Sequence, residues 1–99
     1  MQQFNLTPEN LDKAAGMLKA IAHPVRISII EVLEQGEKLT VTDIYRRLGI
    51  EQATTSHHLG ILRDKGVLLS KREGKNIFYS LRHETLKVLL NCVRGCCNT

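Results

Sequence analysis

Residues 39–66 read LTVTDIYRRLGIEQATTSHHLGILRDKG, a pattern typical of two helices separated by a glycine turn. Thr40 stands where it can cap the first of these helices, with Asp43 three residues later in a capping-box position. The residues LGI at 48–50 close that helix, and a second one is expected over about 51–65. The sequence therefore predicts a helix-turn-helix.

Two further helices are expected before this stretch. The residues TPE at 7–9 supply a cap, a first-turn proline and an acidic residue for a helix that reaches Ile21. The dipeptide His23-Pro24 ends that helix and begins the next, because a proline disfavours helical geometry in the residue before it. We expect the second helix to end at Gly36 in the left-handed conformation.

After residue 66 the hydrophobic period changes from 3.6 to 2. Residues 67–71 and 76–81 are expected to be strands of a hairpin, joined by the sequence REGK at 72–75. A last helix starts at His83 or Glu84 and runs towards Arg94. The predicted fold class is mainly α with a small β-hairpin (α+β), a winged helix-turn-helix of order ααααββα that forms a single domain over residues 1–99.

Composition agrees with one small folded domain. The chain has 99 residues, of which 42% are hydrophobic and only 4% aromatic, so we expect an aliphatic core. It contains neither a run of about 20 apolar residues nor the basic-then-apolar start of a signal peptide. All three cysteines lie in the last eight positions, which is no disulfide framework. These features predict a cytoplasmic protein with reduced thiols and no membrane partner.

The charge is unevenly distributed along the chain. Residues 1–45 carry four basic and six acidic side chains, whereas residues 46–99 carry ten basic and four acidic ones. A basic second half indicates a polyanionic partner. The alternative is solvated surface charge with no partner.

The second helix of the helix-turn-helix is the candidate for reading DNA. A major groove admits one helix, and side chains near the N-terminus of that helix contact base edges. The short or amide-bearing polar residues there are Gln52, Thr54, Thr55, Ser56, His57 and His58. Ala53 or Thr55 is expected to point inward in the first turn, which leaves Gln52, Thr54, Ser56 and His57 facing outward. The alternatives are helix capping for the hydroxyl residues, and catalytic bases or metal ligands for the histidines, although no carboxylate or cysteine stands beside them at ligand spacing.

The predicted hairpin carries a second candidate contact with DNA. Lys71, Arg72 and Lys75 stand at its turn against only Glu73. Long cationic side chains on a protruding turn reach phosphates or the minor groove. The alternative is an edge strand that lysines protect from aggregation.

Three stretches in this order and spacing resemble ArsR/SmtB-family winged-helix repressors over essentially the whole chain. They are LKAIAHPVR at 18–26, TTSHHL at 54–59 with Leu62, and REGK at 72–75 leading to YSL at 79–81. The resemblance implies a homodimer formed by the first and last helices. It also implies a repressor that binds an operator and is released by a metal, metalloid or thiol-reactive signal.

Apolar stripes on both terminal helices exceed what one small core needs, which independently favours dimerisation. The interface candidates are Leu11, Leu18, Leu89 and Val93.

The chain departs from the family at two positions where members bind metal. Where many members have Cys-Val-Cys at the start of the third helix, this sequence has Thr40-Val41-Thr42. A second family site, which binds zinc between the last helices, aligns with His83, Thr85, Cys96 and Thr99. Two of those four are poor zinc ligands, so that site is absent or remodelled.

The remaining candidate metal ligands are Cys92, Cys96 and Cys97. On a helix, residues 92 and 96 share a face and suit two thiolates on one soft ion. We expect Gly95 to break the helix so that Cys97 folds back as a third donor, and Arg94 to lie beside the thiols and favour thiolate. The alternative is that Cys92 is a small buried interface residue and the terminal pair is incidental.

The sequence thus predicts a non-enzymatic, dimeric repressor whose partner is double-stranded DNA with a near-palindromic operator. No cofactor is expected apart from a thiophilic metal or metalloid as inducer. One alternative is a winged-helix module for protein–protein contact without an inducer. Another is a small thiol redox protein that uses Cys96 and Cys97, although the chain lacks a Cys-x-x-Cys motif, a nucleophile–base pair and a phosphate-binding glycine loop.

Overall fold

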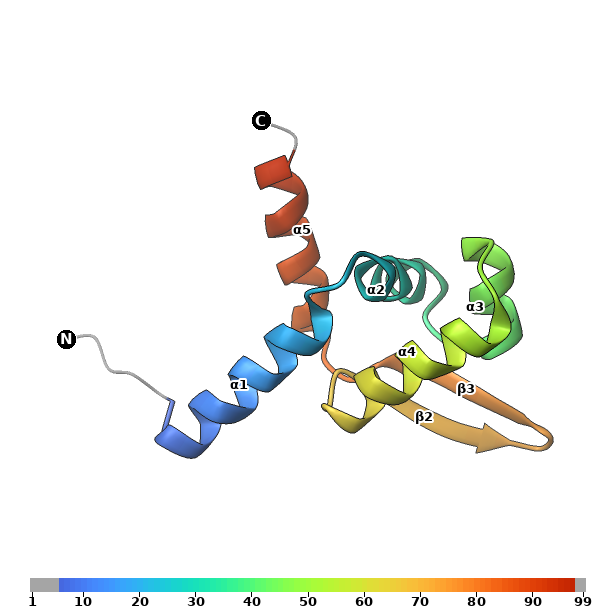
Figure 1. Cartoon of the computed structure of the whole chain (residues 1–99), viewed down its shortest axis with the longest axis horizontal. Helices are drawn as coiled ribbons and strands as arrows, with labels where there is room; N and C mark the ends of the chain where they lie inside the picture. The colour runs from blue at the N-terminus through green and yellow to red at the C-terminus, as the bar shows by residue number, and fades with distance from the viewer. Residues whose placement is uncertain (1–5, 98–99) are drawn as a thin grey trace.

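A computed structural model describes residues 6–97 of the chain (Figure 1). The elements follow one another as α1 (Pro8–Ile21), α2 (Pro24–Gly36), β1 (Leu39–Thr40), α3 (Val41–Leu48), α4 (Gln52–Asp64), β2 (Leu68–Glu73), β3 (Asn76–Leu81) and α5 (Thr85–Cys97). The winged helix-turn-helix is confirmed, and one short strand, β1, is added to the predicted order.

The first two helices begin where their caps predict. The Thr7 hydroxyl accepts a hydrogen bond of 3.2 Å from the backbone N–H of Asn10 at the start of α1. His23 caps α2 in the same way, since its Nδ1 accepts from the N–H of Val25 at 3.1 Å. Each bond satisfies an amide that the helix leaves without an internal partner.

The end of α2 differs from the prediction. Gly36 remains helical, and it is Glu37 that adopts a positive φ of 65°. The N–H of Lys38 donates to the carbonyl of Gly36 at 2.7 Å, so Glu37 is the central residue of a γ-turn, a strained conformation for a residue with a side chain. A glycine precedes the turn because a Cβ at position 36 would lie 2.8 Å from Cδ1 of Leu39. This tight reversal leads the chain directly from α2 into β1.

The sheet has three antiparallel strands in the order β1-β3-β2. In β1, Leu39 pairs with Tyr79 and Thr40 with Phe78. Two residues carry no readable alternation of apolar and polar side chains, and Thr40 is also the cap of α3, so the sequence analysis missed this strand. The hairpin turn is Gly74-Lys75, and the φ of 64° at Gly74 fits a two-residue turn with glycine first.

Aliphatic side chains from all five helices and the sheet meet in one core, as predicted. The innermost ones are Ile29, Ile30, Leu33, Ile44, Leu59, Leu62, Val67 and Leu68. Figure 1 shows α1 and α5 projecting from this body in different directions, whereas α4 lies close to the sheet. The terminal helices therefore keep long faces outside the core.

The last helix is longer than predicted. It continues to Cys97, so the expectation that Gly95 would break it is wrong. A single helical glycine costs only about 1 kcal/mol relative to alanine, which is too little to end a helix that is anchored elsewhere. No helix within residues 6–97 is both long and apolar enough to cross a bilayer.

Candidate nucleic-acid interface

Local hydrogen bonds fix the turn between α3 and α4. The capping box is confirmed, because Thr40 Oγ1 accepts from the Asp43 N–H and Asp43 Oδ2 accepts from the Thr40 N–H, each at 3.1 Å. The bond from the Thr40 N–H also holds the pKa of Asp43 below its ordinary value, so the carboxylate stays charged at the positive end of the α3 dipole. At the other end, Gly49 adopts the left-handed conformation that terminates α3. The start of α4 is thereby held at a fixed angle to α3.

Four of the six predicted residues on α4 face solvent. They are Gln52, Thr54, Ser56 and His57. All four stand within the first two turns of the helix, and each is a short or planar polar side chain of the kind that contacts base edges or phosphates. The outward face of α4 is the one that the sequence analysis described.

The other two residues belong to the inward face, which corrects their assignment as DNA contacts. Thr55 is fully buried and its hydroxyl donates to the carbonyl of Glu51 at 2.9 Å. Ala53 is exposed, so Thr55 is the inward residue of the first turn. His58 is only 8% exposed. Neither Thr55 nor His58 presents a side chain to a groove.

His58 instead connects three helices. Its Nδ1 accepts a hydrogen bond of 3.0 Å from Nε of Arg26 on α2. Nη1 of the same arginine donates to the carbonyl of Ala20 at 3.1 Å, near the end of α1. This role of His58 was not predicted, although Arg26 stands in the HPVR stretch that carries the family resemblance. The pair fixes α4 relative to α2 and α1.

Burial lowers the pKa of His58 below its ordinary value of 6.5, and electrostatic interaction with His23, Arg26 and His57 lowers it further. The ring of His23 lies 4.7 Å from that of His58 and the ring of His57 lies 5.7 Å from it, centroid to centroid. The hydrogen bond from Arg26 requires the imidazole of His58 to be neutral, because a protonated Nδ1 cannot accept it.

We therefore expect the free energy of unfolding to decrease as the pH falls below about 6.5. The unfolded chain takes up the His58 proton at its ordinary pKa, whereas the folded chain takes it up only at lower pH, so acid favours unfolding. Denaturant titrations at pH 7.5, 6 and 5 measure this. His58→Gln, whose amide oxygen still accepts from Arg26, should show a smaller decrease. An equal decrease in both proteins would contradict the assignment.

The hairpin carries exposed cations beside α4. Lys71, Arg72 and Lys75 are all exposed. In Figure 1 the N-terminal end of α4 and the tip of the β2–β3 hairpin point to the same side of the molecule, away from the C-terminal end of α5. Helix and hairpin can therefore approach one duplex together.

Two further cations were not among the predicted contacts. Arg46 and Arg47 are exposed on the last turn of α3. The first helix of a helix-turn-helix crosses the DNA backbone, which makes both residues candidates for phosphate contact. Two consecutive arginines before the glycine turn could have indicated this contact. Basic residues are common in the last turn of any helix, however, because they complement the helix dipole.

The predicted interface residues lie on the projecting helices. Leu11 and Leu18 on α1 are 53% and 56% exposed, Val93 on α5 is 42% exposed, and Leu89 is partly buried. Val88, which the prediction omitted, is 66% exposed. A mostly apolar hollow of about 280 Å³ lies between α1 and α5 and is lined by both helices. Such faces are typical of a protein interface.

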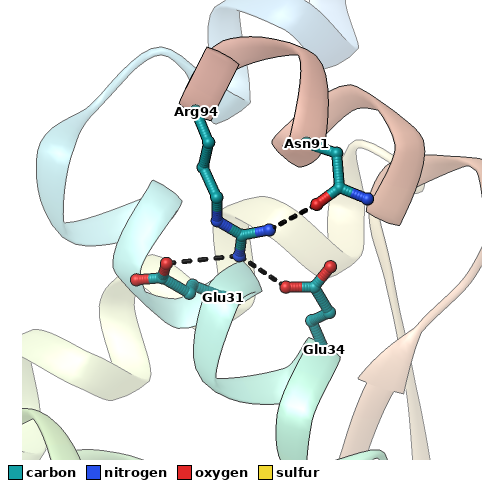
Figure 2. Close-up of polar contacts among 4 residues, drawn as sticks. All are labelled: Glu31, Glu34, Asn91 and Arg94. Carbon is teal, nitrogen blue, oxygen red and sulfur yellow. Dashed lines mark hydrogen bonds and ion pairs between the residues drawn. The ribbon is translucent and has the colours of Figure 1, made fainter. Parts of the chain in front are cut away.

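Arg94 anchors α5 to α2 (Figure 2). Its Nη2 lies 2.6 Å from a carboxylate oxygen of Glu34 and 3.2 Å from one of Glu31, while its Nη1 donates to Asn91 Oδ1 at 2.7 Å. Arg94 was predicted to lie beside the thiols. The guanidinium faces α2 instead, and Cys92 and Cys96, each two positions away on the helix, do not share its face.

The three cysteines are exposed on α5. Because Cys97 remains helical, it does not fold back towards Cys92 and Cys96. Within residues 6–97 of one protomer, no three His, Cys, Asp or Glu side chains gather as metal ligands. Of the positions aligned with the second family site, Thr99 lies outside the described residues. Cys92 is exposed in the single chain, and its burial in a dimer interface, which is the alternative, stays a prediction.

Comparison with known proteins agrees with this geometry. Residues 21–70 match the model of a helix-turn-helix domain family. The biofilm growth-associated repressor of Xylella fastidiosa is 34% identical over 93 residues, which cover 90% of this chain and 81% of that protein. A homologue of a cadmium resistance transcriptional regulatory protein in Staphylococcus aureus is 34% identical over 86 residues, covering 87% of this chain and 71% of that protein.

A solved structure resembles the whole fold. It is a homodimeric winged helix-turn-helix DNA-binding domain from Mycobacterium bovis, described as a possible ArsR-family transcriptional regulator. The TM-score is 0.83 at 28% sequence identity, and the match covers 97% of this chain and 88% of that one. With the helix-turn-helix, the hairpin and these relatives in agreement, the chain belongs to the ArsR/SmtB family of winged helix-turn-helix transcriptional repressors.

Proposed function

We propose that this protein is a cytoplasmic, homodimeric transcriptional repressor that binds a near-palindromic operator. In each protomer the outward face of α4 reads base edges in the major groove, and the β2–β3 hairpin holds the phosphate backbone. The observation that carries the proposal is the division of α4 into two faces. Thr55 and His58 are buried, whereas Ser56 and His57 are exposed beside a hairpin rich in cations.

The proposed dimer accounts for the apolar faces of α1 and α5. Their exposed leucine and valine side chains have no partner in the core, and a two-fold interface covers identical patches on both protomers. A two-fold dimer presents its two recognition helices about 34 Å apart, which matches successive major grooves on one side of a duplex. The near-palindromic operator follows from this symmetry.

Selection of duplexes from a random pool by the full chain tests the function. The expected result is a near-palindromic consensus whose half-sites are centred about one helical turn apart, bound with an affinity that falls steeply as salt rises. Retention of no DNA at low salt would overturn the proposal and favour a module for protein–protein contact. Binding with no consensus would overturn sequence-specific repression.

We further propose that a thiophilic metal ion, a metalloid or a thiol-reactive oxidant releases the repressor through the thiols of α5, chiefly the pair Cys92 and Cys96. Cys92 and Cys96 stand one turn apart on an exposed face of α5, which suits two sulfur donors to one soft ion. Because α5 also belongs to the proposed interface, a ligand bound there acts on the dimer. It releases DNA only as far as it prefers the dimer arrangement that does not bind DNA.

The triple variant Cys92→Ser, Cys96→Ser, Cys97→Ser tests the inducer site. We expect it to bind the selected operator as the wild-type protein does, and to remain bound when arsenite, cadmium, zinc or a mild oxidant is added. Fluorescence anisotropy of labelled operator measures both properties. If every reagent releases the triple variant as it releases wild type, the thiols have no part in induction.

A further inference from the structure

We propose that Lys38 is a positioning residue for DNA binding, which holds the β2–β3 hairpin in place through Glu73. The inference rests on the proposed function, because the hairpin matters here as the contact with the phosphate backbone. Lys38 lies outside both the helix-turn-helix and the hairpin. It stands in the short segment between α2 and β1.

Two contacts join Lys38 to the hairpin. Its Nζ lies 2.6 Å from Oε2 of Glu73, next to the turn, and 4.9 Å from the centre of the Phe78 ring on β3. Lys71 pairs with Phe78 across the strands, and alternate residues of a strand share a face, so Phe78, Lys71 and Glu73 lie on one side of the hairpin. Lys38 therefore bridges β2 and β3 from that side.

The backbone holds Lys38 on both sides. Before it, Glu37 is the centre of the γ-turn that begins at the carbonyl of Gly36. After it, Leu39 is buried in the core and pairs with Tyr79. Because its backbone is fixed relative to α2, Lys38 restrains the hairpin relative to α2. A lysine in a mobile loop would move with the hairpin and would not restrain it.

The ion pair with Lys38 also offsets the negative charge of Glu73. Glu73 is the only acidic residue between positions 65 and 83, and it stands next to Arg72 and close to Lys75. The hydrogen bond from Lys38 lowers the pKa of Glu73, so the carboxylate is ionised wherever the hairpin meets DNA. Paired with Lys38, it repels phosphates less than it would alone.

Four variants separate the positioning role from this charge effect. Lys38→Met is expected to weaken operator binding about three- to tenfold, because the hairpin loses its restraint and the carboxylate of Glu73 is left unpaired. Lys38→Arg keeps the ion pair and the contact with the ring, so it should bind within about twofold of wild type. Lys38→Met/Glu73→Gln has the net charge of wild type but no ion pair, and it should remain weaker than wild type. Lys87→Met, which removes a lysine of α5 that pairs with Glu84, is the matched control and should bind normally.

Order parameters from ¹⁵N relaxation supply a readout that needs no DNA. The amides of Gly74 and Lys75 should become more mobile in Lys38→Met and in the double variant, and stay as in wild type in Lys38→Arg. Unchanged order at the tip in Lys38→Met, or wild-type affinity in the double variant, would overturn the positioning role. If the wild-type protein itself binds no DNA, the proposed function fails, while the relaxation data still decide whether Lys38 fixes the hairpin.

Discussion

Replacing Leu18 and Val93 by glutamate is expected to turn the protein into a monomer and to reduce operator affinity at least about 100-fold. Both side chains are largely exposed in the single chain, so the double variant Leu18→Glu/Val93→Glu should still fold. At a two-fold interface, however, each glutamate meets apolar surface on the partner and must be desolvated there. Without a partner, each monomer binds one half-site alone and loses the high effective concentration that links two sites.

Sedimentation velocity at micromolar concentration measures the association state, and anisotropy with the selected operator measures the affinity. Ile77→Glu is the matched control for sedimentation, because Ile77 is exposed to the same extent as Val93 but lies on the hairpin. That control should remain dimeric. A monomeric wild-type protein, or a double variant that still sediments as a dimer, would be incompatible with an interface on α1 and α5.

Removing Arg72 and Lys75, two of the three hairpin cations, is expected to weaken binding to operator and to random DNA by the same factor. One phosphate contact contributes a salt slope of about 0.9, so its loss at about 0.1 M salt lowers the binding constant roughly eightfold. The variant Arg72→Ala/Lys75→Ala should therefore bind both duplexes roughly 60-fold more weakly, with a slope reduced by about two units. Because phosphates carry no sequence information directly, the ratio of the two affinities should not change.

Titrations at four salt concentrations, with the operator and with a scrambled duplex, test this prediction. Lys87→Ala on α5 removes a positive charge far from the hairpin turn and serves as the control. A double variant that keeps its affinity for random DNA and loses only the preference for operator would reverse the roles assigned to the hairpin and to α4.

Local sequence signals predicted the elements of the fold well. Thr40 with Asp43, Thr7 with Pro8, and the histidine before Pro24 each mark a helix start through hydrogen bonds that span at most three residues. Capping hydrogen bonds of this kind can be predicted from short sequence patterns. They placed the helix-turn-helix and the hairpin, and therefore the outward side chains of α4.

Features that depend on tertiary contact were not predictable in the same way. The bond between Arg26 and His58 joins residues 32 positions apart, and that between Lys38 and Glu73 joins residues 35 apart. Arg94 reaches Glu31 over 63 positions. None of these pairs produces a local or periodic sequence pattern from which the contact could be predicted. His58 was therefore assigned to DNA, because a polar residue on a recognition helix looks like a base contact until a buried partner is seen.

The central claim is that the outward face of α4 reads the operator sequence, and a base-pair scan tests it most directly. Every base pair of one selected half-site is changed in turn, and each duplex is titrated with wild type, Ser56→Ala and His57→Ala. The account predicts that each variant loses discrimination at one or two positions, by about 1–3 kcal/mol, and keeps the wild-type profile elsewhere. Scan profiles of both variants that match wild type at every position would contradict it.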